Sequence, residues 1–500
     1  MRANPNDPSS TGSIFKQKID VLLPEALMTS RITTVQALLL LACTHFARGA
    51  ESAAWLHSGL AFRMASDLGL FVSDYKYQVA KGQMAPEELE LRRRVAWAAY
   101  TIDKIHSLYQ GRQVSIRFSD IGVPASFLDS FEENEYWTPI AYQSRSKVSM
   151  FGCTVFSVST FTQLCKLTII LEQIIETLYG VKSSQNSKQY LLTDLERLKQ
   201  SLSEWFHSLP DHLRMNFRNP PPLNFQSSPS ITSKAKSPNV ISLNALYHCL
   251  VILLNRPFLP YGHLYDRVID EIDTIQEDRL PLIARTAWKV CVDAAWQISH
   301  LMSLYRGSVT MKGAPQLISY INFCAAGIHV RLAAQVGPQS DEVQRKTSEE
   351  ALRAVRACLE DFEENEHSNP GVAKANNVIR RMAKHFSIYP DQIEGNYVNS
   401  STIFITDSTN KRRRSEIQSS VQDENHTIST PSSALMSNRS EGLATTSSSS
   451  NLEIMNTDLF DLNAFLSTFD DLNQPESLSN TASGGNTGDD VMFGFLKYTQ

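Results

Sequence analysis

Residues 86–110 read PEELELRRRVAWAAYTIDKIHSLYQ. Pro86 suits the first position of a helix, where its missing N–H costs nothing, and the two glutamates that follow favour the positive helix N-terminus. Gly111 directly after the stretch fits a helix exit. Apolar residues recur along the stretch at helical spacing: Leu91, Val95, Ala98, Ile102, Ile105 and Tyr109. The stretch therefore predicts one long helix with a buried face.

Two stretches upstream, residues 31–47 and 52–68, also repeat apolar residues at helical spacing. In the second, an i+4 stripe predicts the buried face: Leu56, Leu60, Met64 and Leu68. Gly69 is placed to end this helix. Arg63 and Asp67 lie four residues apart on the neighbouring stripe, so we expect them at the edge of the buried face.

The sequence downstream carries more signals of the same kind. Further helices are predicted near residues 156–179, 187–208, 240–256, 282–305, 315–335 and 344–364. No stretch alternates with a period of two, so a sheet is not indicated. The fold class predicted is all-α: a partly ordered segment over 1–30, then many packed antiparallel helices over 31–390. A Pro-, Ser- and Asn-rich stretch over 216–239 predicts an exposed loop within this helical domain.

Composition supports a helical body with a different tail. Hydrophobic residues make up 42% and charged residues 20%, enough apolar material to bury a core. Residues 391–500 carry 6 Lys and Arg against 15 Asp and Glu, a net charge of −9, which leaves +4 for residues 1–390. A body so weakly basic lacks the electrostatic signature of a strong DNA binder.

The cysteines and the apolar runs bear on the class of protein. The seven cysteines are scattered and form no CxxC pair, which argues against a disulfide framework and a sulfur-ligated metal site. The segment that follows Met1 is polar, unlike a signal peptide, and the longest apolar run, around 37–43, is too short to span a membrane. We expect a soluble protein.

The tail after residue 390 divides into three predicted parts. Residues 391–451 are rich in Ser, Thr and Asn and are expected to be a disordered linker, because so few apolar residues cannot offset the entropy of ordering. Within it, Lys411, Arg412, Arg413 and Arg414 form a basic run that suits recognition by an import receptor. The alternative is a chance run of charges. Residues 473–500 are expected to be a disordered tail.

Residues 452–472, LEIMNTDLFDLNAFLSTFDDL, interleave acidic and large apolar residues. This pattern is typical of an acidic-hydrophobic activation segment, whose apolar residues enter a coactivator groove as a helix. The residues expected to enter the groove are Phe460, Leu462, Phe465, Leu466 and Phe469. The alternative is a C-terminal helix that docks back on the body.

Charges within the helical body form the sharpest remaining pattern. They could bind an anionic ligand, but no histidine, serine or cysteine stands at a catalytic spacing from them, and no HExxH, P-loop or GxSxG motif is present. We therefore predict no enzyme, and a structural role for these charges. Arg63 or Asp67 is expected to contact a charge on the 86–110 helix. The predicted structural charge cluster comprises Arg63, Asp67, Arg94, Asp103 and Arg112. The acidic runs FEENE (131–135) and DFEENE (361–366) are expected to be solvated helix ends rather than metal sites.

With these residues assembled, the chain resembles the middle regulatory region of fungal zinc-cluster transcription factors. The matching stretches are TTVQALLLL, SGLAFRMASDLGL, ELELRRRVAWAAYTIDK, YQGR, SIRFSDIGVP and LYHCLVILLNRPFL. The similarity covers roughly residues 31–385 and is greatest to the branch around the nitrate-assimilation regulators. The six-cysteine zinc cluster that opens family members is not in this sequence.

The resemblance implies a nuclear regulator of RNA polymerase II transcription, which activates genes with its tail and lacks its own DNA-binding module in this chain. It implies no cofactor here, although full-length family members hold zinc. The implied partners are transcriptional coactivators, an import receptor and homo- or heterodimer partners among zinc-cluster factors, with DNA reached only through the absent module. The alternatives are an all-helical enzyme or small-molecule sensor, and a scaffold that titrates full-length relatives.

Overall fold

The computed structural model describes residues 12–388, except residues 73–81, 83, 130, 139–151, 181–182, 216, 218–235, 261, 269–280 and 337–339. The described residues belong to one compact unit. The predicted import signal at 411–414 and the predicted activation segment at 452–472 lie outside the described residues, as do the predicted linker and tail around them. Most of the predicted loop over 216–239 also lies outside them.

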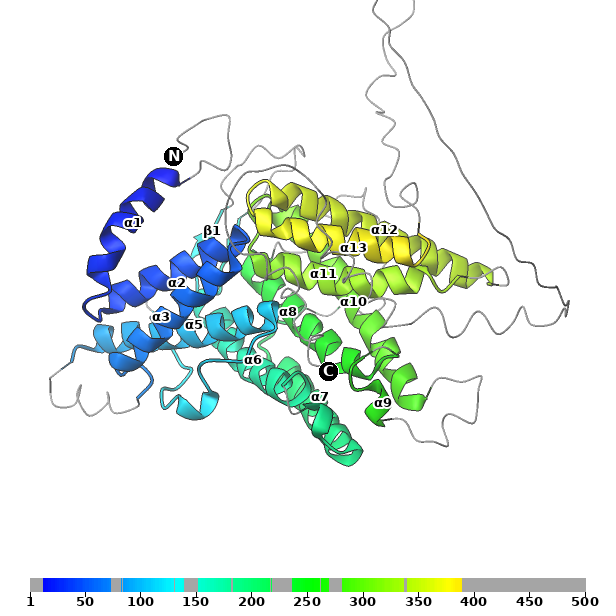
Figure 1. The fold of residues 1–500 in the computed structure, drawn as a ribbon, viewed down its shortest axis with the longest axis horizontal. Helices are drawn as coiled ribbons and strands as arrows, with labels where there is room; N and C mark the ends of the chain where they lie inside the picture. Colours follow the sequence, from blue (N-terminus) through cyan, green and yellow to red (C-terminus); the bar gives the residue numbers. More distant parts are fainter. Residues whose placement is uncertain are drawn as a thin grey trace, which may run out of the picture. The chain divides into compact units, whose positions relative to one another are not determined.

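The described part of the chain is helical, as the sequence predicts (Figure 1). Its α-helices are, in order, α1 (Ser13–Ala26), α2 (Ile32–Ala47), α3 (Glu51–Asp67), α5 (Pro86–Gln110), α6 (Ser157–Leu178), α7 (Lys188–Ser208), α8 (Pro238–Asn255), α9 (Tyr265–Val268), α10 (Leu282–Ser308), α11 (Gln316–Ala333), α12 (Glu342–Glu366) and α13 (Ala373–His385). Short 3-10 helices lie between them: η2 (Phe118–Asp120), η3 (Ser183–Gln185), η4 (Arg256–Phe258) and η5 (Pro370–Val372).

Every helix that the sequence predicts is observed, with bounds that differ by only a few residues. Pro86 begins α5, and Gly111 follows it in the left-handed conformation, with a φ of 60°. Among the described residues, three helices were not predicted: α1, α9 and α13. One strand pair was also not predicted. It joins β1 (Tyr136–Trp137) to β2 (Cys153–Thr154) in antiparallel register.

Helices α2 and α3 pack on each other as an antiparallel hairpin, and both contact α5. The buried face of α3 differs from the predicted one, because Leu56 is 66% exposed and Leu60 is 41% exposed. Small residues provide most of the buried face instead: Ala54, Ser58, Ala61 and Ala65, with Phe62 and Met64. Small side chains allow two helix backbones to approach closely, so Leu56 and Leu60 are turned outward, while Met64 and Leu68 of the predicted stripe contact the core.

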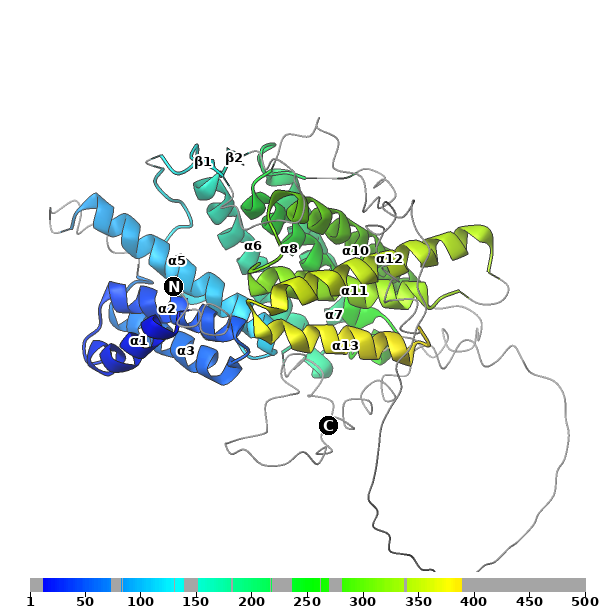
Figure 2. The ribbon, with the colours of Figure 1, turned by 90° about the horizontal axis from the view of Figure 1, so that it is seen from above.

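Helix α8 lies at the centre of the larger core, where α6, α7, α10 and α11 pack around it. Helices α12 and α13 cover α11 (Figure 2). Two helical stretches, Ser157–Leu178 and Pro238–Phe258, are long and apolar enough to cross a membrane. Both are packed inside the domain, where a core helix needs the same composition.

The beginning and the end of the described domain meet at two glycines. Gly49 follows α2 with a φ of 75°, and a Cβ on Gly371 in η5 would lie 3.0 Å from the Gly49 nitrogen. Beside this contact, Lys374 of α13 places its Nζ 3.1 Å from Glu51 Oε1 of α3. Larger residues at either glycine would push η5 away from α2.

Candidate functional site

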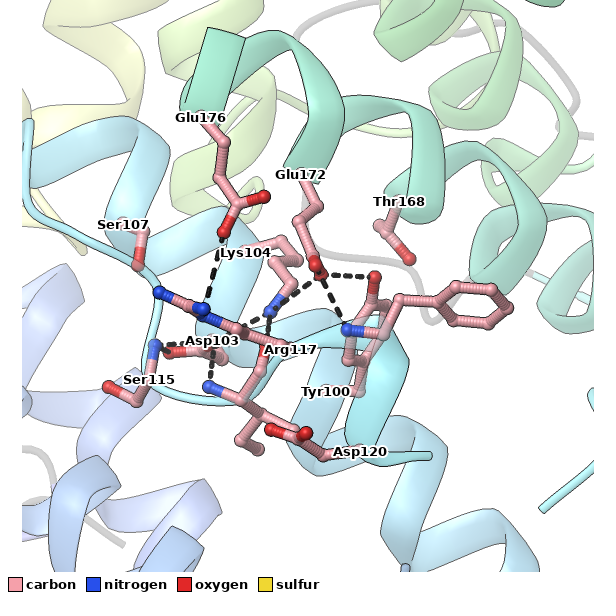
Figure 3. A network of polar contacts seen from close by, with 12 residues as sticks. Tyr100, Asp103, Lys104, Ser107, Ser115, Arg117, Asp120, Thr168, Glu172 and Glu176 are labelled. Atoms are coloured by element: carbon pink, nitrogen blue, oxygen red, sulfur yellow. Dashed lines mark hydrogen bonds and ion pairs between the residues drawn. The ribbon is translucent and has the colours of Figure 1, made fainter. Parts of the chain in front are cut away.

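The most strongly charged buried region of the described chain lies between α5 and α6 (Figure 3). From Val95 onward, α5 is enclosed on almost every side, so its polar side chains must find partners inside the protein. Asp103 and Lys104 are both fully buried, and Lys104 Nζ lies 2.8 Å from Asp103 Oδ2. Glu172 of α6 supplies a second carboxylate, with Oε2 at 3.2 Å from the same Nζ. One ammonium group is thus shared by two buried carboxylates.

The two carboxylates also hold the segment that follows α5. Asp103 accepts hydrogen bonds from the backbone N–H groups of Ser115 and Ile116, each at 3.0 Å. Glu172 Oε1 accepts one from the N–H of Phe118 at 2.9 Å. Lys104 Nζ donates to the Ile116 carbonyl oxygen. The network therefore fixes residues 115–118 against α5 and α6, and we call these residues the clamped segment.

Tyr100 completes the network from one turn before Lys104. Its hydroxyl donates to Glu172 Oε2 at 2.6 Å, and the Lys104 ammonium lies 4.1 Å from the centre of its ring. Burial raises the pKa of the Tyr100 hydroxyl above its usual range, and the hydrogen bond to the Glu172 carboxylate adds to that shift. Tyr100 therefore serves as a donor, and nothing here lowers its pKa toward that of a catalytic base.

A second group of charges holds the next part of the same connection. Arg94 donates from both terminal nitrogens to the Glu132 carboxylate, each at 2.9 Å, and from Nε to Glu90 at 2.8 Å. Glu90 also accepts from the N–H of Leu128 at 3.0 Å. The Arg94 hydrogen bonds lower the pKa of Glu132, and those to Glu132 are the largest cause of the raised pKa of Arg94. Because both terminal nitrogens of Arg94 bond to the same carboxylate, the contact fixes the relative orientation of the two side chains as well as the distance between them.

The acidic run FEENE does not end a helix, contrary to the prediction. Glu132 pairs with Arg94, and Glu133 accepts hydrogen bonds from the N–H of Ser159 at 2.9 Å and from its hydroxyl. Ser159 lies in the first turn of α6, where unpaired N–H groups favour an acidic partner. His212 Nε2 lies 3.2 Å from the same hydroxyl. Glu132 and Glu133 therefore hold the connection between α5 and α6 against both helices.

The structure does not bring the five predicted charges into one cluster. Asp103 and Arg94 take part in the two separate groups described above. Arg112 lies over the ring of Trp55, with Cζ 4.9 Å from its centre. Arg63 and Asp67 are exposed, and among the described residues neither forms an ion pair. The predicted contact between α3 and a charge on α5 is therefore not made, because both side chains point away from the packed face of α3.

Sequence reasoning missed three residues that matter most here: Glu90, Lys104 and Glu172. Lys104 and Glu172 are charges inside apolar helical patterns, which is a signal of a paired buried group, whereas Glu90 lies in a charged run that carries no such signal. The pattern of Glu172, in LTIILEQII, shows it most clearly. Spacing alone could not identify the partners, because α5 and α6 are separated by the long connection that the network holds.

No arrangement in the described residues resembles a catalytic centre. The Ser159, His212 and Glu133 side chains meet, but Glu133 approaches the same His212 nitrogen as the serine, at 3.7 Å, so it cannot orient the imidazole as a triad acid does. No group of three or more His, Cys, Asp or Glu side chains within the described ranges is placed to hold a metal ion. The geometry instead supports positioning of one chain segment.

Comparison with known proteins shows which proteins the chain is similar to. Residues 3–207 match the fungal specific transcription factor domain. The nitrogen assimilation transcription factor nirA of Emericella nidulans is 27% identical over 345 residues, which cover 68% of this chain and 35% of nirA. The nitrogen assimilation transcription factor nit-4 of Neurospora crassa is 25% identical over 332 residues, 66% of this chain and 27% of nit-4.

A third relative, the activatory protein CHA4 of Saccharomyces cerevisiae, is 28% identical over 243 residues, 48% of this chain and 34% of CHA4. This chain thus spans about a third of the length of these relatives. No solved structure matches it. The matched domain, nirA and nit-4 are named as transcription factors, and the resemblance to nitrogen regulators is confirmed. Over the matched residues, the chain is therefore similar to fungal proteins that carry this transcription factor domain.

Proposed function

We propose that this chain is a regulator of RNA polymerase II transcription that acts in the nucleus. The observation that carries the proposal is the match of residues 3–207 to the fungal specific transcription factor domain, together with relatives named as transcription factors. In this proposal the helical domain is the regulatory body, and the charge network between α5 and α6 keeps its first helices in register with the larger core.

The proposed output of the chain is residues 452–472, acting on a transcriptional coactivator. This segment combines large apolar residues with aspartates, and no Lys or Arg occurs between Arg439 and Lys497. The aromatic residues would fill a coactivator groove, while the acidic residues steer the segment toward basic surfaces. The aromatic residues should therefore contribute more to activation than the acidic residues.

A reporter assay tests this output directly. The full chain is fused to an unrelated DNA-binding domain, with Phe460, Phe465 and Phe469 intact or all changed to Ala. We expect the intact fusion to activate transcription and the triple variant to lose most of the activity. Changing Asp458, Asp461, Asp470 and Asp471 to Asn should reduce it only partly. A silent intact fusion, or a fully active triple variant, would overturn the proposed activating role.

Nuclear import is proposed to use Lys411, Arg412, Arg413 and Arg414, because four consecutive cations between polar residues suit an import receptor. Changing all four to Ala in a fluorescent fusion of the full chain should abolish its nuclear accumulation. As a matched control, Lys346, Arg345, Arg353 and Lys384 in α12 and α13 should tolerate the same change. Unchanged accumulation of the first variant would contradict the assignment.

DNA is proposed to be reached only through another protein or module. Sequence-specific readout needs an element that fits the groove and cations that hold phosphates, and residues 1–390 carry a net charge of only +4. Fluorescence anisotropy with a pool of duplexes should show weak binding by this chain that falls steeply with salt. A tight, sequence-selective complex would overturn this part of the proposal.

A further inference from the structure

Helix α1 carries an apolar stripe on its outer face. No residue of α1 is buried, and its contact with the domain core uses the partly buried Leu23 and, just after the helix, Leu27. The large apolar residues of the opposite face are exposed: Ile14 by 48%, Phe15 by 62%, Val21 by 77%, Leu22 by 61% and Met28, just past the helix end, by 83%. A soluble protein rarely leaves so many large apolar side chains on one helix face uncovered.

Two charges lie in the middle of this stripe. At about 3.6 residues per turn, Lys18 and Glu25 fall between the row that contains Val21 and the row that contains Leu22. They lie about 10 Å apart along the helix axis, which is too far for them to pair with each other. Within the described part of the chain neither forms an ion pair. Each charge therefore faces outward among apolar side chains, with no ion-pair partner among the described residues.

The order of residues along the stripe is self-complementary. If two α1 helices lie antiparallel about a two-fold axis between Val21 and Leu22, Lys18 of each copy faces Glu25 of the other. The same register places Val21 against Leu22 and Phe15 against Met28. A parallel pairing would instead bring like charges together, which is unfavourable. Charge and apolar pattern thus select one arrangement.

We propose that the outer face of α1 binds the same face of a second copy of this chain, as an antiparallel helix pair. Such an interface is isologous, so each contact occurs twice and the assembly closes as a dimer. A helix of this length covers less than the roughly 800 Å² per partner of a standard interface, so we expect a dimer that dissociates on dilution. This inference does not depend on the proposed function.

Sedimentation velocity of the full chain, at concentrations from roughly 1 to 100 µM, tests the proposal. The wild-type chain should shift from monomer to dimer across this range. The double variant Val21→Asp/Leu22→Asp should stay monomeric. As a matched control, Leu282→Asp, which changes a leucine of α10 that is 72% exposed, should dimerise as the wild type does. Because all these side chains are exposed, thermal melts should confirm that each variant is folded.

A charge swap distinguishes the proposed antiparallel register from nonspecific association through apolar side chains. Lys18→Glu and Glu25→Lys should each weaken the dimer about tenfold or more, because each brings like charges together twice. The combined variant Lys18→Glu/Glu25→Lys should restore an affinity close to that of the wild type. A wild-type chain that is monomeric throughout would overturn the proposal. So would a dimer that survives Val21→Asp/Leu22→Asp, or single and combined charge swaps that behave alike.

Discussion

The contact between α5 and α6 and the core around α8 are both buried, but different interactions hold them. Between α5 and α6, Asp103, Lys104 and Glu172 share charge and bind backbone N–H groups of the clamped segment. Around α8, apolar side chains such as Leu250 and Phe258 fill the interior. The stability of the α5–α6 contact depends on particular charged partners, whereas the stability of the core around α8 depends on the volume of its side chains. A substitution should therefore have different consequences in the two regions.

The largest effect should come from Lys104→Met, which removes the shared cation but keeps most of the side-chain volume. Asp103 and Glu172 would stay buried without it, which should lower the free energy of unfolding by roughly 4 kcal/mol. Chemical denaturation measures this loss. The matched control is Lys199→Met, because Lys199 Nζ lies 2.8 Å from Glu196 Oε1 on the surface of α7. The control should cost less than about 1 kcal/mol. Equal losses would mean that the buried charge network contributes no more to stability than a surface ion pair.

The core around α8 should respond to volume. Leu250 is fully buried, so Leu250→Ala should lower the free energy of unfolding by roughly 3 kcal/mol through lost contacts and a cavity. Leu250→Met nearly conserves the volume and should cost about 1 kcal/mol or less. The same denaturation experiment measures both. A methionine variant as unstable as the alanine variant would mean that this core also needs particular shapes.

The core around α8 should also lose stability in acid. His329 of α11 hydrogen-bonds Ser299 Oγ at 2.8 Å, and burial lowers its pKa to about 4 from an ordinary value near 6.5. The unfolded chain therefore takes up a proton below about pH 6.5 while the folded chain does not, so stability is present above that pH and is lost as the pH falls toward 4. At about pH 5 the loss from this group should reach roughly 2 kcal/mol.

His329→Gln isolates that contribution, because glutamine still reaches Ser299 but does not titrate. The drop in the free energy of unfolding between about pH 7.5 and pH 5 should be smaller in this variant by roughly 2 kcal/mol. His106 and His248, whose pKa values burial lowers to about 4 and about 3, add losses of the same sign, whereas Asp361, whose pKa burial raises to about 7, works in the opposite direction. An identical pH profile in both proteins would show that His329 titrates normally.

The smallest effect should come from the pair that the sequence made most conspicuous. Arg63→Ala and Asp67→Ala should each change the free energy of unfolding by less than about 0.5 kcal/mol, because both side chains are exposed on α3. Arg94→Ala, which removes the fork onto Glu132, should cost clearly more. If Arg63→Ala lowers the free energy of unfolding as much as Arg94→Ala does, Arg63 must make a stabilising contact.

Helical periodicity was sufficient to predict most of the fold. The long helix over 86–110 begins at its proline and is followed by its glycine as predicted, because both residues act through local backbone geometry. Helix α13 carries a similar periodic signal, since its buried residues recur at helical spacing: Ala375, Val378, Ile379, Met382 and Ala383. The predicted buried face of α3 is wrong because it follows the large apolar residues. Close packing against α2 instead requires alanine and serine at the helix contact.

The charge network could be predicted only in part. The sequence predicts a structural role for Asp103 and Arg94, and the structure places each of them in a group of paired charges. Their partners depend on which helix lies opposite and on how the connection between α5 and α6 returns, and neither is encoded in local spacing. The clamped segment adds a further difficulty, because its backbone N–H groups bind carboxylates whatever its side chains are. A sequence pattern contains no trace of such contacts.

Hydrogen exchange of residues 115–118 tests most directly whether the buried carboxylates hold the clamped segment. In the wild-type chain, the N–H groups of Ser115, Ile116 and Phe118 should exchange slowly although they lie outside any α-helix. Asp103→Asn should speed exchange at Ser115 and Ile116, and Glu172→Gln at Phe118, while α11 keeps its protection in both variants. Fast exchange of this segment in the wild type, or unchanged protection in both variants, would contradict the account.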